Sequence, residues 1–122
     1  MPLLHGEITE QIIGAAFEVH GILGYGFLEK VYQRAMLIEL GLRGLQLQEE
    51  SPITVYYKDH VVGLYEADLW VEEKVIVELK IAKEYNPFDE AQLLNELKAT
   101  QVRVGLLINF GREKVEFKRF IL

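Results

Sequence analysis

The sequence has no cysteine, only three prolines and no long apolar run. Without cysteine, disulfides, thiolate metal sites and thiol catalysis are excluded. A helix that crosses a bilayer needs about 20 consecutive apolar residues, so we expect no membrane segment. The start of the sequence also lacks the charged, apolar and small-residue pattern of a signal peptide. We therefore expect a cytoplasmic protein.

Basic side chains are outnumbered, with 13 Lys and Arg against 19 Asp and Glu, which gives a net charge of -6. This balance argues against a protein that coats nucleic acid without specificity. It does not exclude a nuclease, because the metal site of a nuclease is itself a group of acids. The length of 122 residues, half of them hydrophobic, predicts one domain over residues 1–122 with a substantial core.

Apolar periodicity predicts an α/β fold with the element order ααβββαββ. Gly41 is expected to end the second helix, and Pro87 to open the third. The expected helices are residues 7–20, 27–40 and 88–100, and the expected strands are 53–57, 61–71, 74–81, 102–109 and 114–120. The residues expected to face the core from the second helix are Leu28, Val31, Tyr32, Ala35 and Ile38. A helix between two strands allows a parallel crossover, so we expect a mixed sheet flanked by helices.

Glu78 and Lys80 lie in the most informative strand, which is otherwise apolar. Side chains two residues apart on a strand project from the same face, so these two share one. Placing a carboxylate and an ammonium there costs desolvation free energy. A bound divalent cation and a polyanionic substrate would offset that cost. The competing interpretation is an ordinary ion pair on a solvent-exposed strand face.

Asp68 lies in the preceding expected strand, residues 61–71, and its place relative to Glu78 depends on the hairpin between the two strands. A two-residue turn would set Asp68 opposite Val77 and away from Glu78. A three-residue loop at residues 72–74, or a bulge, would set Asp68 opposite Glu78, because opposed residues of antiparallel strands share a face. We predict this longer loop.

Five polar side chains sit in otherwise apolar elements, and they form a candidate catalytic group: Glu29, Asp68, Glu78, Lys80 and Gln92. Mg²⁺ and Mn²⁺ prefer oxygen ligands, and Mg²⁺ commonly takes only one or two protein carboxylates. The backbone carbonyl of Leu79 is a possible further ligand. A lysine beside such a site can orient the attacking water. The alternatives are a solvated helix carboxylate for Glu29 and a helix-surface amide for Gln92.

The sequence resembles a family of small proteins named for the pattern GxxExxY, which Gly26, Glu29 and Tyr32 match. The residues at 68, 78–80, 91–94 and 105–111 continue the match in order, so the resemblance covers residues 5–120. That family is placed in the PD-(D/E)XK nuclease-like superfamily, which implies a restriction-endonuclease-like core. The implied reaction is metal-dependent hydrolysis of phosphodiester bonds, in DNA before RNA.

The resemblance also implies roles for individual residues. Asp68 and Glu78 take the places of the superfamily's metal-binding acids, Lys80 that of its lysine, and Glu29 that of its helix glutamate. Gln92 matches the glutamine of the RecB-like branch, in which a tyrosine follows four residues later. Two residues depart from the pattern, because Glu96 replaces that tyrosine and Asp89 stands where a histidine is common. The departures put substrate handling in doubt more than metal binding.

A basic group near the C-terminus is a candidate nucleic-acid contact, formed by Arg112, Lys114, Lys118 and Arg119. Phe117 and Phe120 are an odd number of residues apart, so they should face opposite sides and not form one stacking platform. The second hypothesis is a catalytically inactive module that binds nucleic acid or protein. The small size suggests a homodimer or a partner protein.

Overall fold

Two helices precede the sheet in the computed structural model, which describes residues 3–122. Helix α1 (Gly6–Leu23) buries one stripe of small and branched side chains that includes Ile12, Ala15 and Val19. These residues recur at intervals of three and four, which is the spacing of one helix face. The helix continues past residue 20, where the sequence predicted its end, to Leu23, and Gly24 is its C-cap.

Helix α2 (Glu29–Leu42) buries Tyr32 as the sequence predicted, but other residues of the predicted inward face are exposed. Its buried residues are Tyr32, Gln33, Met36 and Leu40. The expected inward residues Leu28 and Ile38 are 75% and 66% exposed, so that part of the prediction was wrong. The buried stripe repeats every four residues and includes an amide, which an apolar pattern alone does not reveal. Gly41 lies inside the helix rather than at its end.

The sheet has five strands in chain order: β1 (Leu47–Tyr57), β2 (His60–Val71), β3 (Val75–Lys80), β4 (Val104–Asn109) and β5 (Glu116–Ile121). Only β3 and β4 pair in parallel, and helix α3 (Pro87–Thr100) makes the crossover between them. The other neighbouring strands are antiparallel. The predicted α/β fold with a mixed sheet and the order ααβββαββ is therefore confirmed. Strand β1 begins at Leu47, earlier than the expected residue 53.

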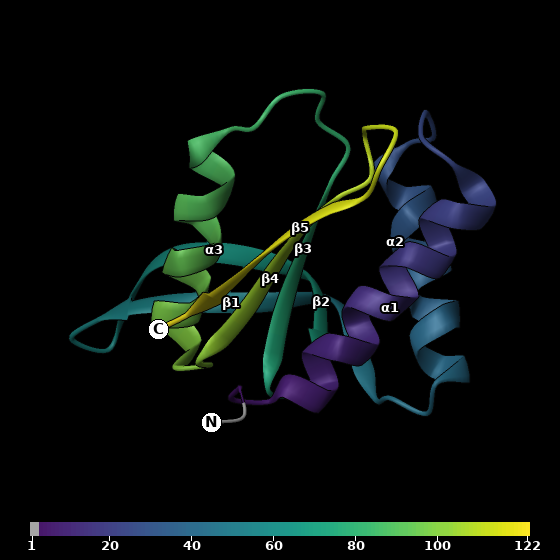
Figure 1. Cartoon of the computed structure of the whole chain (residues 1–122). Helices are drawn as coiled ribbons and strands as arrows, with labels where there is room; N and C mark the ends of the chain where they lie inside the picture. The colour runs from purple at the N-terminus through teal and green to yellow at the C-terminus, as the bar shows by residue number, and fades with distance from the viewer. Residues whose placement is uncertain (1–2) are drawn as a thin grey trace.

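The helices cover opposite faces of the sheet, α1 and α2 on one and α3 on the other (Figure 1). Val75, Val77 and Leu79 of β3 join the core under α1 and α2. Ile76 joins the second core under α3, so β3 alternates between the two layers. Glu78 has the same parity as Ile76 and therefore faces α3. Within residues 3–122, no helix is both long and apolar enough to cross a membrane.

The β2–β3 hairpin has the predicted three-residue loop. Val71 pairs with Val75 and Leu69 with Val77, and residues 72–74 form the turn between them. This register places Asp68 opposite Glu78, as the sequence analysis required. Recorded pairing between β2 and β3 ends at Leu69, so beyond that point the two strands diverge and form a fork.

Strand β2 is irregular at Asp68. Ala67 packs in the core under α3, whereas Leu69 packs in the core under α1 and α2. Residues two apart on a regular strand share a face, so the strand turns over at the residue between them. The neighbouring Glu50 of β1 has a φ of 50° at the same level of the ladder. The β1–β2 register is the same on both sides of this level, so the irregularity inserts no extra residue and is a local change of strand twist at Asp68.

Candidate active site

The Asp68 side chain is fixed by the backbone of the next strand. Its Oδ2 atom accepts a hydrogen bond from the backbone N–H of Leu79 at 2.8 Å. Its backbone carbonyl accepts a second hydrogen bond from Nε2 of Gln33 at 3.1 Å. The bond to Gln33 links β2 to helix α2. The carboxylate is therefore held by β3, and the backbone of the same residue is held by α2.

The backbone N–H and C=O groups of Leu79 both point to the fork between β2 and β3. The N–H and C=O of one strand residue point to the same edge of the strand, and the N–H of Leu79 points to Asp68. The next carbonyl, that of Lys80, points the other way and accepts a hydrogen bond from the N–H of Phe110 at 2.8 Å. The Leu79 carbonyl thus faces the fork, which is where a backbone metal ligand would have to be.

Glu78 is 3% exposed, so the interpretation as a solvent-exposed ion pair is wrong. Its carboxyl contacts those of Glu96 and Asp68. Burial, the contact with Glu96 and the charge of Asp68 together raise the pKa of Glu78 to about 12. Its Oε1 atom is buried and receives no hydrogen bond from the residues that the structure describes. Such an oxygen is satisfied by a shared proton or by a cation.

Glu96 is the residue whose role the sequence did not reveal. It lies on α3, is fully buried, and accepts a hydrogen bond from Nε2 of Gln92 at 3.2 Å. In the sequence, Glu96 is notable only as a departure from the expected tyrosine that puts substrate handling in doubt. In the structure it is paired with Gln92 and contacts Glu78. Gln92 is itself partly buried, and its hydrogen bond to the buried Glu96 distinguishes it from a fully solvated surface amide.

Lys80 and Glu29 line the outer side of the same group. The Nζ atom of Lys80 lies 3.8 Å from Oδ1 of Asp89, and both side chains are partly exposed. Glu29 is the first residue of α2 and is half-buried. Burial and the charges of Asp68 and Asp89 raise the pKa of Glu29 above its usual value, while Lys80 acts in the opposite direction. Glu29, Asp68, Glu78 and Lys80 therefore lie near one another between the fork and the start of α2. Gln92 is linked to them through its hydrogen bond to Glu96 on α3.

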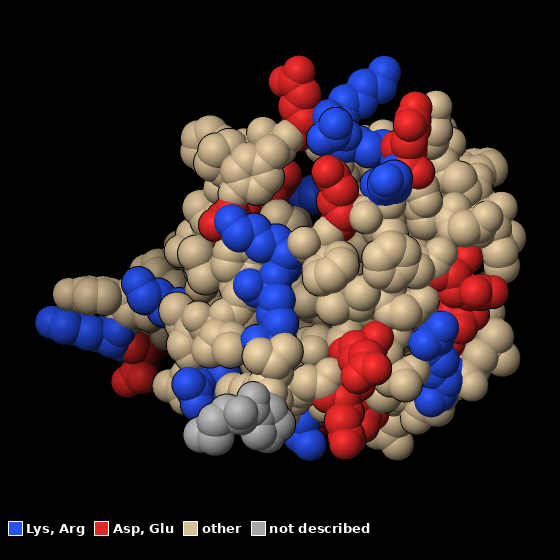
Figure 2. Space-filling view, in the orientation of Figure 1, with Lys and Arg blue, Asp and Glu red and all other residues tan. Residues whose placement is uncertain are grey.

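The C-terminal basic residues do not converge in this way. Arg112 pairs with Glu116 at 3.4 Å, and Lys118 pairs with Glu90 at 3.1 Å. Arg119 points to the opposite face of β5 and donates to the carbonyl of Leu4. Figure 2 shows acidic and basic side chains interleaved near the β4–β5 loop and a column of basic side chains over β5. The expected separation of Phe117 and Phe120 is confirmed, since Phe117 packs on Phe17 of α1 and Phe120 in the core under α3.

A small set of hydrogen bonds made by Asn109, which no motif in the sequence predicted, fixes the end of β3. The Asn109 side chain accepts from the N–H groups of Ala82 and Gly111, both at 3.0 Å, and donates to the carbonyl of Ala82 at 2.8 Å. This amide joins the end of β4 to the chain just beyond Lys80. An asparagine that follows a buried apolar strand was the only signal in the sequence.

The oxygen donors at the fork suit a hard divalent cation. Asp68, Glu78 and the Leu79 carbonyl provide oxygen atoms, and two protein carboxylates are a usual number for Mg²⁺. Among residues 3–122, no three His, Cys, Asp or Glu side chains stand close enough together to form a ligand group as they are placed. The fit therefore rests on two carboxylates with waters, and on the buried Oε1 of Glu78 that lacks a donor.

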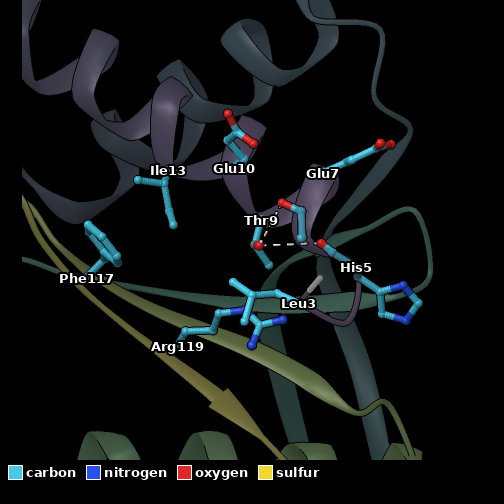
Figure 3. Close-up of a pocket in the computed structure, with 9 residues that line it drawn as sticks. Leu3, His5, Glu7, Thr9, Glu10, Ile13, Phe117 and Arg119 are labelled. Atoms are coloured by element: carbon cyan, nitrogen blue, oxygen red, sulfur yellow. Dashed lines mark hydrogen bonds between the residues drawn. The ribbon is translucent and has the colours of Figure 1, made fainter. Parts of the chain in front are cut away.

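A pocket of ≈ 750 Å³ lies away from these acids, between the start of α1 and β5 (Figure 3). Phe117, Ile13 and Arg119 line it, together with Glu7 and Glu10. It opens on the face of β5 opposite to α3. This pocket is therefore separate from the candidate catalytic residues, despite its volume.

Comparisons with known proteins identify the superfamily and the fold of the chain. Residues 6–120 match the sequence profile of a family described as PD-(D/E)XK nuclease superfamily. The fold is similar to a solved structure reported as "Crystal structure of SSO0001", with a TM-score of 0.51 and 14% identity over 97% of this chain and 79% of that chain. At that identity the likeness shows a shared fold alone. No curated protein matches the sequence significantly.

Proposed function

This chain belongs to the PD-(D/E)XK nuclease superfamily, and we propose that it is a Mg²⁺- or Mn²⁺-dependent nuclease that hydrolyses phosphodiester bonds in DNA, with RNA as the second choice. The observation that carries the proposal is the 2.8 Å hydrogen bond between Asp68 and the N–H of Leu79. It holds one carboxylate beside Glu78 at the fork, with Lys80 two residues further on.

Each residue of the group has a proposed role. Asp68 and Glu78 bind the cation, with the Leu79 carbonyl as an additional ligand and Glu29 as a ligand or a partner through water. A bound divalent cation lowers the pKa of a water molecule and neutralises charge on a phosphate. The Lys80 ammonium orients that water or stabilises the developing charge. Gln92 orients the site or contacts the substrate.

Finer placement within the superfamily is part of the proposal. The spacing of Gly26, Glu29 and Tyr32 supports the GxxExxY family, and Gln92 supports the RecB-like branch. Tyr32 is buried, donates to the carbonyl of Gly24 at 2.6 Å and stacks on Phe110. It therefore fixes the connection that leads into Glu29, as a packing residue would.

The basic residues Arg112, Lys114 and Lys118 remain proposed contacts to the nucleic-acid backbone. Arg119, also predicted as a contact, has weaker support because its guanidinium turns to the α1 face. A single module of this size covers only about 600–1,000 Å² of a duplex. We therefore also propose that a homodimer or a partner protein completes the contact with DNA.

One observation favours the alternative, a catalytically inactive nuclease-fold module. Asp89 stands 3.8 Å from Lys80 and competes for the ammonium that the reaction would use. Cleavage of labelled single-stranded DNA, duplex DNA and RNA with Mn²⁺, Mg²⁺ or EDTA distinguishes the two functions. Metal-dependent cleavage supports the nuclease. Binding of nucleic acid without cleavage under any metal supports the module and contradicts the nuclease.

A further inference from the structure

Two carboxyl groups, those of Glu78 and Glu96, are buried against each other without a basic partner. Glu96 is 0% exposed and Glu78 is 3% exposed. Among the described residues, none of the salt bridges involves either side chain. Each group keeps one buried oxygen, Oε1, that receives no conventional hydrogen bond within residues 3–122. Buried polar groups in folded proteins are almost always satisfied, so this pair requires an explanation.

Glu96 connects two candidate residues of the site that lie on different elements. On α3, its Oε2 accepts from Nε2 of Gln92 at 3.2 Å, across one helical turn. On the sheet, its carboxyl contacts that of Glu78. Helix α3 lies across the sheet on the face where Glu78 points (Figure 1). Through Glu96, helix α3 therefore holds the carboxyl group of Glu78 at the end of β3.

The bond to Gln92 also decides which way that amide faces. Because Glu96 takes the Nε2 group, the Gln92 carbonyl oxygen is turned away from Glu96. A carboxylate at this position of the helix can accept from the amide and meet the Glu78 carboxyl at the same time. An apolar side chain of equal size can do neither. The residue that replaces the tyrosine of the RecB-like branch thus has a definite task in the geometry of this chain.

We propose that Glu96 is a positioning residue, which holds the Glu78 carboxyl and the Gln92 amide in their working orientations. This inference rests on the proposed function, because it concerns how the same site binds its cation. Glu96 does not itself touch the cation or the substrate. Substituting a residue that hydrogen-bonds to a metal ligand commonly lowers metal affinity or activity by about 10–100-fold.

Two variants of the purified full chain separate this role from the alternatives. Glu96→Gln keeps the size, and its amide can donate to Glu78 while its carbonyl accepts from Gln92. Glu96→Leu keeps the volume and removes both contacts. Val104→Ala in the other core is the matched control, because it lowers stability without touching the site. Calorimetric Mn²⁺ titration and thermal unfolding are measured for all four proteins.

Glu96→Leu is expected to weaken Mn²⁺ binding by about tenfold or more while its unfolding temperature stays equal or rises, because a buried carboxyl is replaced by an apolar group. Glu96→Gln is expected to stay within about threefold of wild type, and Val104→Ala to lose stability with unchanged Mn²⁺ affinity. In cleavage assays at saturating Mn²⁺, Glu96→Leu should lower kcat and leave KM nearly unchanged. Wild-type Mn²⁺ affinity in Glu96→Leu would overturn the proposal. An equal loss of Mn²⁺ affinity in Glu96→Gln and Glu96→Leu would also overturn it, because that result would make Glu96 a direct ligand of the ion.

A readout without metal keeps this test independent of the nuclease proposal. The side-chain amide resonances of Gln92, assigned by their loss in Gln92→Leu, report whether Glu96 holds that group. They should shift and broaden in Glu96→Leu and remain near their wild-type positions in Glu96→Gln. Unchanged resonances in Glu96→Leu would contradict the positioning role. A wild type that binds no Mn²⁺ but shows these shifts would contradict the proposed function and leave the positioning contact standing.

Discussion

The Asp68 carboxylate accepts a hydrogen bond from the backbone N–H of Leu79 at 2.8 Å. Asp68 lies one residue, and Leu79 two residues, beyond Leu69 and Val77, which form the last pair of the β2–β3 ladder. The side chain thus takes an N–H that continued pairing would have given to β2. Three features make this possible, namely the three-residue loop, the turnover of β2 at Asp68 and the divergence of the two strands. The predictions below follow from that arrangement.

Asp68→Asn and Asp68→Ala should separate the structural and metal-binding parts of this contact. Asparagine can still accept from the Leu79 N–H, so its free energy of unfolding should fall by less than about 1 kcal/mol. Alanine leaves that N–H without its partner and should cost about 1–3 kcal/mol. Both should weaken Mn²⁺ binding by about tenfold or more, because a charged ligand is lost. Denaturant unfolding and Mn²⁺ calorimetry measure the two effects, and unchanged Mn²⁺ affinity in Asp68→Asn would remove Asp68 from the ligand set.

The stability of the metal-free protein should fall as the pH rises, because of Glu78. Its pKa is about 12 in the folded chain against 4.5 as the ordinary value. Between these values the folded state keeps a proton that the unfolded state releases, so this contribution is full below pH 4.5 and is lost as the pH rises toward 12. The slope can reach about 1.4 kcal/mol per pH unit.

Unfolding of wild type and Glu78→Gln between about pH 5.5 and 8.5 checks this dependence. The wild type should lose stability across that window, and Glu78→Gln should show a flatter profile. Glu66→Gln, an exposed carboxylate on β2, is the control and should keep the wild-type slope. Parallel profiles for wild type and Glu78→Gln would show that Glu78 ionises normally. Binding of Mn²⁺ should release about one proton per ion and strengthen with pH.

Lys80→Met should separate catalysis from metal binding. The substitution keeps much of the apolar stem and removes the ammonium that pairs with Asp89 at 3.8 Å. Cleavage should fall by about 100-fold or more, while Mn²⁺ affinity stays within about threefold. The measurement is kcat at saturating Mn²⁺ beside calorimetry on the same preparation. Full activity in Lys80→Met would exclude the lysine from the reaction.

Gly111→Ala should destabilise the end of β3. A Cβ at this position would lie 2.4 Å from the backbone carbon of Ile81 and 2.5 Å from its oxygen. The backbone of Ile81 cannot move aside as a flexible side chain can, so the substitution should lower the free energy of unfolding by about 2 kcal/mol or more. Gly21→Ala is the matched control, because its Cβ meets nothing within 4 Å and it lies inside α1. That control should gain about 0.5–1 kcal/mol. Equal unfolding temperatures for the two variants would contradict the close approach at Gly111.

Much of the fold and the site could be predicted because the relevant signals are local. The three-residue loop follows from the requirement that Asp68 and Glu78 share a face, and the alternating strand β3 places Glu78 and Lys80 together. The start of β1 was missed because Glu49 and Pro52 are not typical strand residues.

Other parts of the site depend on tertiary contacts that no local pattern carries. Gln33 looks like a surface amide until the kinked strand brings the Asp68 carbonyl to it. Glu96 looks like a surface acid until α3 buries it against Glu78. The exposed face of α2 at Leu28 and Ile38 was misjudged because apolar residues occur on both sides of that helix.

Calorimetric titration of Mn²⁺ into wild type and Glu78→Gln, followed by cleavage of labelled single- and double-stranded DNA in the same buffer, tests the central claim most directly. The account predicts that the wild type binds Mn²⁺ and cleaves DNA, and that the single substitution removes both. A wild type that binds no Mn²⁺, or a Glu78→Gln variant that still binds and cleaves, would contradict a metal-dependent nuclease centred on Glu78.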